Sequence, residues 1–172
     1  MNTLRWFCAV ALALGLLAPA ARAQEFPKPG PEHEHLKKLE GTWDATMKGP
    51  GIDSKGTMTY KMDVGGLWLT SNFEGEFAGQ KFHGKGLDSY DAGKKKFVGV
   101  WVDNMVTSPL ILEGTYDKDK KQLTMTGDGP SPAGTVKFKS VTTYKDDDNI
   151  VFDMYMGDAK EPGFTITYKR KK

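Results

Sequence analysis

Side chains alternate between apolar and polar at a period of two residues along nearly the whole chain after Gly41. This period is typical of β-strands with one buried face, because successive side chains of a strand point to opposite sides of its sheet. Between the alternating segments lie glycine, proline, asparagine and aspartate residues, which favour tight turns. The sequence predicts about ten strands: Thr42–Met47, Lys55–Asp63, Leu67–Phe77, Phe82–Tyr90, Lys96–Asn104, Leu110–Tyr116, Gln122–Gly127, Thr135–Tyr144, Ile150–Met156 and Phe164–Lys169.

The connections between these strands indicate the architecture. They are too short for the helical crossovers that parallel strands need, so consecutive strands should pair antiparallel. A meander of this length tends to curl, and closing it removes two exposed edges. We therefore predict an all-β fold, an antiparallel up-and-down β-barrel of about ten strands, with a β-sandwich as the alternative.

A short helix is expected before the first strand. Pro31 can open it, acidic residues occupy its first turn, Lys37 and Lys38 occupy its last turn, and Gly41 follows. This order of charges suits the helix dipole, and glycine ends helices readily.

The N-terminus has the features of an export signal. Arg5 precedes the apolar run Trp6–Ala18 of 13 residues, Pro19 breaks that run, and Ala21-Arg22-Ala23 is a small-x-small cleavage site. The run is shorter than the ~20 residues of a membrane-spanning helix. We expect residues 1–23 to be a signal peptide cleaved after Ala23, with a periplasmic or extracellular destination. Residues 24–35 then form a Pro-rich lead-in and residues 36–172 a single barrel domain.

Charge and cysteine content exclude several kinds of function. The chain has 24 Lys+Arg and 22 Asp+Glu, and without Arg5 and Arg22 of the leader the two counts are equal. A nucleic-acid-binding protein needs a basic surplus, so we expect no nucleic-acid partner. The one cysteine, Cys8, lies in the leader, so the mature chain has no disulfide and no thiolate site. No phosphate-binding loop or hydrolase motif occurs, and no cofactor is expected.

The predicted barrel interior is rich in methionine and aromatic residues. Methionine adapts to ligands of varied shape, and a barrel of this size can enclose one small molecule. The hypothesis is that a secreted, non-enzymatic barrel binds a small apolar or amphipathic molecule; the alternative is that methionine only fills irregular gaps in the core. The candidate ligand-binding residues are Tyr60, Met62, Trp101, Asp103, Met105, Tyr116, Met125, Tyr144 and Met154. We also place Met58 and Met156 on inward faces.

The strand around Trp101 has two plausible inward faces. Either Val98, Val100 and Val102 point inward, or Trp101 and Asp103 do. An inward Asp103 could act as an acid or base with a tyrosine partner, which would indicate an enzyme. The simpler interpretation is that Asp103 caps the turn after its strand. A third hypothesis is an envelope protein with a filled barrel whose outer face binds a partner.

The three histidines offer little for metal chemistry. His33 and His35 lie two residues apart, so in a helix they point about 200° apart. We interpret both as part of a solvated helix start and predict no metal site. A haem-binding barrel would need an axial histidine on an inner strand, and only His83 lies on a predicted strand.

A set of short motifs follows the predicted strands and turns. The motifs are Gly41-Thr42-Trp43, Ser54-Lys55-Gly56, Gly65-Gly66, Phe82-x-Gly84-x-Gly86, Tyr90-Asp91, Lys94-Lys95-Lys96, Trp101-x-Asp103, Glu113-Gly114-Thr115-Tyr116, Ser140-Val141-Thr142 and Phe152-x-Met154-Tyr155. With these motifs the chain resembles the secreted bacterial family known as domain of unknown function 1579, and the resemblance implies a lipocalin-like (calycin-type) fold without an assigned activity. The resemblance also implies that Trp43 closes the barrel floor after Gly41, with Arg170 or Lys169 stacked on its ring.

Overall fold

The structure is a computed structural model that describes residues 26–77, 79–131 and 134–172. The signal peptide expected at residues 1–23 lies outside the described residues.

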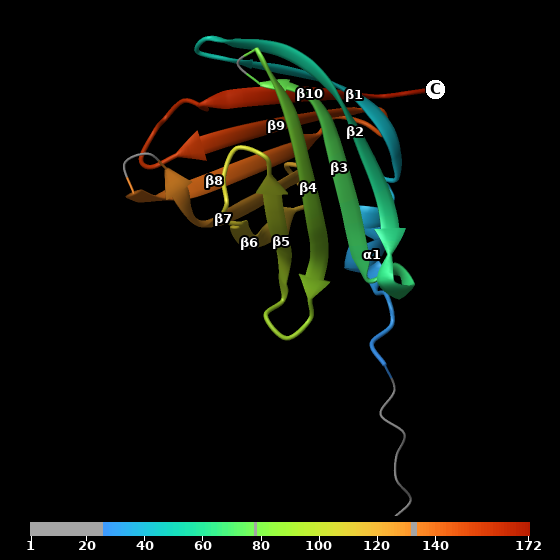
Figure 1. The fold of residues 1–172 in the computed structure, drawn as a ribbon. Helices are drawn as coiled ribbons and strands as arrows, with labels where there is room; N and C mark the ends of the chain where they lie inside the picture. The colour runs from blue at the N-terminus through green and yellow to red at the C-terminus, as the bar shows by residue number, and fades with distance from the viewer. Residues whose placement is uncertain (1–25, 78, 132–133) are drawn as a thin grey trace, which may run out of the picture.

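The described chain forms one short helix followed by ten strands that close into a barrel (Figure 1). Every neighbouring pair of strands is antiparallel, and each strand pairs with the next in sequence. The predicted up-and-down barrel is confirmed, and the sandwich alternative is wrong. The elements are α1 (Pro31–Lys37), β1 (Gly41–Gly49), β2 (Ile52–Asp63), the 3-10 turn η1 (Val64–Gly66), β3 (Trp68–Phe77), β4 (Gln80–Asp91), β5 (Lys96–Asp103), β6 (Leu110–Asp117), β7 (Gln122–Ser131), β8 (Gly134–Tyr144), β9 (Asn149–Met156) and β10 (Phe164–Arg170).

The first and last strands close the barrel. β1 pairs with β10 in a register that sets Trp43 opposite Arg170 and Met47 opposite Ile166. Closure pairs the outer backbone groups of β1 and β10 with each other. In an open sheet these groups would remain unpaired at the two edges.

The two-residue alternation determines which side chains enter the barrel. Met58, Leu69, Phe73 and Met125 are buried, as their strand faces predict. Met156 is an exception, because β9 ends at this residue on the rim and leaves its side chain 45% exposed.

Helix α1 covers one end of the barrel, at the lower right of Figure 1. Its Leu36 and the following Leu39 are buried in the barrel core. The helix contacts β2, β3 and β4, and the antiparallel order puts the turns 91–96, 117–122 and 144–149 at this same end. The opposite end is bounded by the turns after β1, β3, β5, β7 and β9, and no helix covers it in the described chain.

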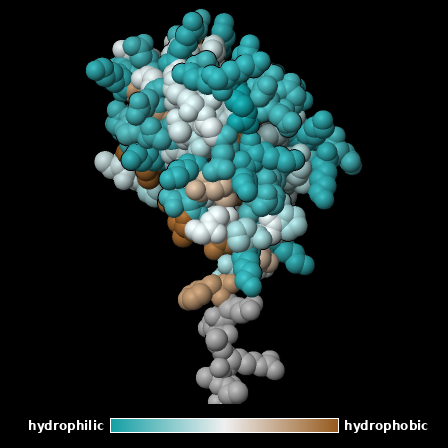
Figure 2. All heavy atoms as spheres, turned by 90° about the vertical axis from the view of Figure 1, so that its right-hand side faces the viewer, coloured by the Kyte–Doolittle hydropathy of each residue, from teal (hydrophilic) through white to brown (hydrophobic). Residues whose placement is uncertain are grey.

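The outer face seen in Figure 2 is mostly hydrophilic, with hydrophobic side chains gathered near the start of the described chain. No helix among the described residues has the length and hydropathy of a membrane-spanning segment.

Candidate functional site

The lumen contains a cavity of about 350 Å³. Ligand sites in proteins are mostly apolar hollows of roughly 300–1,000 Å³ with a few polar groups, so this cavity has the size of a small-molecule site. Its wall includes Met58, Leu69, Phe73 and Ile166, together with a small number of polar side chains. The described lumen therefore holds a cavity, which favours the binding hypothesis over the filled-barrel alternative.

Most of the predicted ligand-binding residues line this cavity. Tyr60, Trp101, Asp103, Met105, Met125, Tyr144 and Met154 do so. Met62 packs against the core without lining the cavity, and Tyr116 lies at the α1 end instead. Met105 lies in the loop between β5 and β6 and is 58% exposed. It therefore lies at the barrel end opposite α1, called the mouth below, and not in the interior.

Trp101 faces the lumen, which decides between the two possible faces of β5. Phe97 on the same face is buried, whereas Val102 on the other is 46% exposed. A methyl group at Gly84 would come within 2.1 Å of the Trp101 ring. The indole lies in space that only a glycine leaves open, so Gly84 on β4 allows the inward orientation of Trp101.

Asp103 also lines the lumen, but both oxygens of its carboxylate accept hydrogen bonds from protein donors. Oδ2 accepts a hydrogen bond from Trp101 Nε1 at 3.0 Å, and Oδ1 accepts from the backbone N–H groups of Met105 and Val106 at 2.8 and 3.3 Å. These bonds fix the start of the loop at the mouth. The geometry favours the turn-capping interpretation of Asp103 over an acid/base role.

The lumen contains a second carboxylate, Asp88 on β4, which the sequence analysis missed. It lies on the inward face of β4 beside Gly99 of β5, where a methyl group would come within 2.5 Å of Asp88 Oδ1. Protein encloses this carboxylate, yet it keeps partial accessibility because it borders the cavity. Burial raises its pKa to about 7, since the charged form loses hydration. The motif Phe82-x-Gly84-x-Gly86 already marks the inward positions of β4, and Asp88 is the next of them.

Three tyrosines border the same cavity as Asp88. They are Tyr60 on β2, Tyr144 on β8 and Tyr168 on β10. Burial raises the pKa of each hydroxyl, and the charge of Asp88 raises the pKa values of Tyr60 and Tyr144 further. All three therefore remain neutral hydroxyl groups, which can donate or accept hydrogen bonds, at physiological pH.

Trp43 and Arg170 close the barrel at its α1 end. Trp43 is 1% exposed, and its Nε1 donates a hydrogen bond to the Leu39 carbonyl at 2.9 Å. Arg170 stacks over the indole with its Cζ 4.1 Å from the ring centroid, and it donates to the carbonyls of Lys38 and Glu40. Gly41 has φ of +120°, and a methyl group there would approach the Arg170 guanidinium. The floor arrangement that the resemblance implies is present in this geometry.

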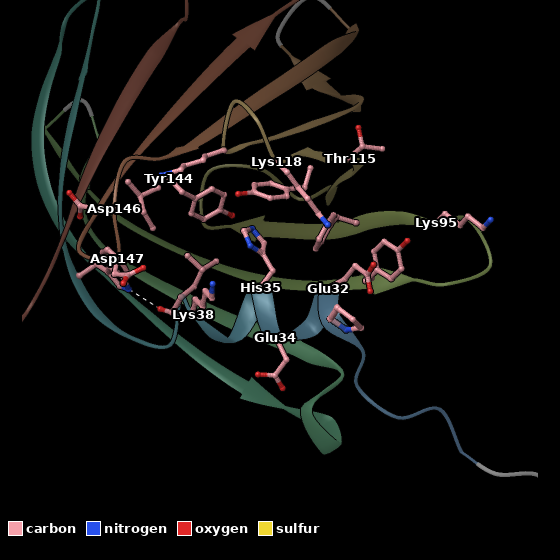
Figure 3. A pocket seen from close by; sticks show the side chains of 18 residues that line it. Glu32, Glu34, His35, Lys38, Lys95, Thr115, Lys118, Tyr144, Asp146 and Asp147 are labelled. Carbon is pink, nitrogen blue, oxygen red and sulfur yellow. Dashed lines mark hydrogen bonds between the residues drawn. The ribbon is translucent and has the colours of Figure 1, made fainter.

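A second cavity, of about 700 Å³, lies outside this floor beside α1 (Figure 3). Leu39, Phe97, Tyr144 and Ile150 line both cavities and form the partition between them. This outer cavity is bordered by lysines and acidic residues from α1 and the adjacent turns, so it is far more polar than the lumen.

The interpretation of His33 and His35 as a solvated helix start is wrong. His33 is 7% exposed, and its Nδ1 accepts a hydrogen bond from the Gly30 N–H at 3.0 Å, which caps the start of α1. His35 points from α1 toward Tyr144 (Figure 3), with ring centroids 4.7 Å apart. It also packs on Tyr116 at 4.2 Å. The helix turns both rings inward because α1 lies across the barrel end.

Replacement of His35 by phenylalanine is expected to remove an acid-sensitive element of stability. Burial and then the charge of Lys38 lower the pKa of His35, and its Nε2 is buried without a hydrogen-bond partner in the described chain. The folded state therefore disfavours protonation, and wild-type stability from this group is lost as pH falls below about 6.5. Urea unfolding at several pH values should show the H35F-minus-wild-type difference growing in favour of the variant on acidification. A difference that stays constant with pH would contradict this role.

His83, the candidate axial ligand, points outward on β4. Its Nε2 lies 2.8 Å from the Asn72 side-chain oxygen on the exposed surface. Across the described ranges, no three His, Cys, Asp or Glu side chains are grouped in a way that could hold a metal ion.

A closed antiparallel barrel with a helix across one end and a hollow, mainly apolar lumen defines a cavity-containing β-barrel. The family model described as protein of unknown function (DUF1579) matches residues 28–170, and the chain belongs to this family. The resemblance drawn from the motifs is confirmed.

Structural comparison finds similar folds among redesigned proteins. One redesigned β-barrel is 20% identical over 80% of this chain and 95% of its own, with a TM-score of 0.44. Another, the redesigned barrel mFAP1 bound to DFHBI, is 18% identical over 78% of this chain and 97% of its own, also with a TM-score of 0.44. No curated protein sequence matches the chain.

Proposed function

We propose that this protein binds one small, mainly apolar molecule inside its barrel and performs no chemistry on it. The observation that carries the proposal is the hollow lumen of about 350 Å³, walled by buried methionine, leucine and aromatic side chains. An apolar cavity of this kind gains free energy by taking apolar surface out of water, at roughly 25 cal/mol per Å² buried.

The mouth supports entry of such a molecule. Met105 and Val106 are 58% and 45% exposed in the loop beside it, so an apolar surface lies at the entrance. Ser108 and Leu110, farther along the same loop and the start of β6, border the cavity as well. The apolar residues at this end are therefore suited to contact an apolar molecule as it enters.

Two neighbouring substitutions on β8 test the proposal. Thr142 lines the cavity and Val141 does not, because adjacent side chains point to opposite faces. Thr142→Phe fills part of the lumen and should weaken binding of decanol, measured by calorimetry, by about tenfold or more. Val141→Phe adds similar bulk outside and should leave affinity unchanged. Equal affinity for decanol in the wild type and the T142F variant would contradict a lumenal site.

We further propose that the protein is exported. The support is the sequence of residues 1–23, with its basic start, apolar run and small-x-small end. The intact mass of the mature protein recovered from its native host should correspond to a chain that begins at Gln24. A full-length mass retaining Met1 would contradict cleavage.

A further inference from the structure

We infer that the lumen selects an amphipathic organic cation, such as a long-chain amine, whose charged end pairs with Asp88. This inference rests on the proposed function, because it names the chemistry of the molecule that the lumen binds. Four features of the described cavity support it.

The first feature is the sign of the charge in the lumen. Among the described residues that line the cavity, the ionisable acids are Asp88 and Asp103, and there is no lysine, arginine or histidine. An anionic ligand such as a fatty acid would bring a third carboxylate into this space without a cationic partner. Burial of an unpaired charge is strongly unfavourable, whereas a cation would compensate a carboxylate already present.

The second feature is that the two carboxylates differ in how far protein donors satisfy them. Asp103 accepts bonds from Trp101 Nε1 and from two backbone N–H groups. Asp88 makes no hydrogen bond or ion pair within the described chain, although protein surrounds it. Gly99 makes room for the Asp88 carboxylate itself, because a methyl group there would come within 2.5 Å of Oδ1. Of the two lumenal carboxylates, Asp88 is therefore the one that no protein donor satisfies in the described chain.

The third feature is the composition of the surrounding wall. The hydroxyls of Tyr60, Tyr144 and Tyr168 make no hydrogen bond within the described chain, and burial keeps them neutral. Tyr60 on β2 and Tyr144 on β8 lie close enough for the charge of Asp88 to raise their pKa values, and Tyr168 on β10 borders the same cavity. The neighbours of Asp88 on β3 and β5, Leu69 and Gly99, carry no charge. Aromatic faces and hydroxyl oxygens both attract an ammonium group, so the wall adds to the attraction of the carboxylate.

The fourth feature is the depth at which these groups lie. Asp88 is three residues from the α1 end of β4, and Tyr60 is three residues from the same end of β2. Tyr144 is the last residue of β8. The polar layer thus lies at the closed end, while Phe77, Phe82 and Phe164 line the part nearer the mouth. A long-chain amine fits this gradient with its ammonium group inside and its alkyl chain toward the opening.

Three probes of equal chain length test the inference: decylamine, decanol and decanoate, with affinities measured by calorimetry at about pH 8. There the amine is a cation and Asp88 is ionised. Wild-type protein should bind decylamine about tenfold or more tightly than decanol, and decanoate more weakly than decanol. In Asp88→Asn the preference for the amine should disappear while decanol still binds. Asp44→Asn removes an acid from the outer surface and should keep the wild-type order of affinities.

Each result discriminates between the inference and the proposed function. If wild-type protein binds decanol but prefers decanoate, or if D88N keeps the amine preference, the inference is wrong and the lumenal site stands. If decanol, decylamine and decanoate all fail to bind wild-type protein, the proposed function is wrong and the inference falls with it.

Discussion

Replacing Trp43 by alanine should lower the free energy of unfolding by about 3–5 kcal/mol, the usual cost of truncating a buried aromatic side chain. Trp43 is 1% exposed and fills the floor between Leu39 and Arg170. Its loss leaves a cavity and also removes the ring on which the guanidinium stacks. Urea denaturation monitored by circular dichroism measures this change.

Trp68→Ala provides the matched control. Trp68 begins β3 next to the buried Leu69, so it lies on the outward face and is only partly buried. The same substitution there should cost less than half as much. Equal losses for the two variants would mean that Trp43 has no special role in closing the barrel.

Asp88→Asn should stabilise the protein at neutral and alkaline pH. An unfolded aspartate loses its proton near pH 3.8, whereas folded Asp88 holds its proton up to a pKa of about 7. Between these values the folded state binds more protons, so wild-type stability falls as pH rises. At 1.36 kcal/mol per unit, this cost reaches up to about 4 kcal/mol above pH 7. Asparagine has nearly the shape of the neutral acid and does not titrate.

Unfolding free energies of wild type and D88N, measured from about pH 4 to about pH 8, test this prediction. The two proteins should be nearly equal at the acidic end, and the advantage of the variant should grow as pH rises. Asp44→Asn, on the exposed surface, should show no comparable trend. A D88N protein that is less stable than wild type at about pH 8 would show that the charged carboxylate has a stabilising partner, contrary to the structure.

The barrel itself was predictable because its main determinant is local. Inward residues such as Leu69 and Met125 follow directly from the period of two, and turn residues mark where each strand ends. Most of the ligand-binding residues predicted with the help of this alternation also line the lumen. It did not resolve β5, where valines and aromatic residues compete for the same face, because the space for Trp101 comes from Gly84 on another strand.

The polar part of the site was harder to predict, for physical reasons. Asp88 breaks the rule that inward positions are apolar, so the alternation gave no reason to place it inward, although Gly84 and Gly86 precede it on the same face of β4. His35 was misplaced because the position of α1 across the barrel end is a tertiary feature, which the helix sequence alone does not contain. Asp88 lies in the candidate site itself, and functional sites commonly break local patterns.

The most direct test of the lumenal site is a titration with decanol followed by NMR of methionine methyl groups. Met47, Met58, Met125 and Met154 line the cavity, whereas Met62 shares a strand face with Met58 but lies outside it. The account predicts saturable shifts of the four lumenal signals and an unchanged Met62 signal. Shifts of Met62 alone, or no shift at saturating decanol, would contradict binding in the lumen.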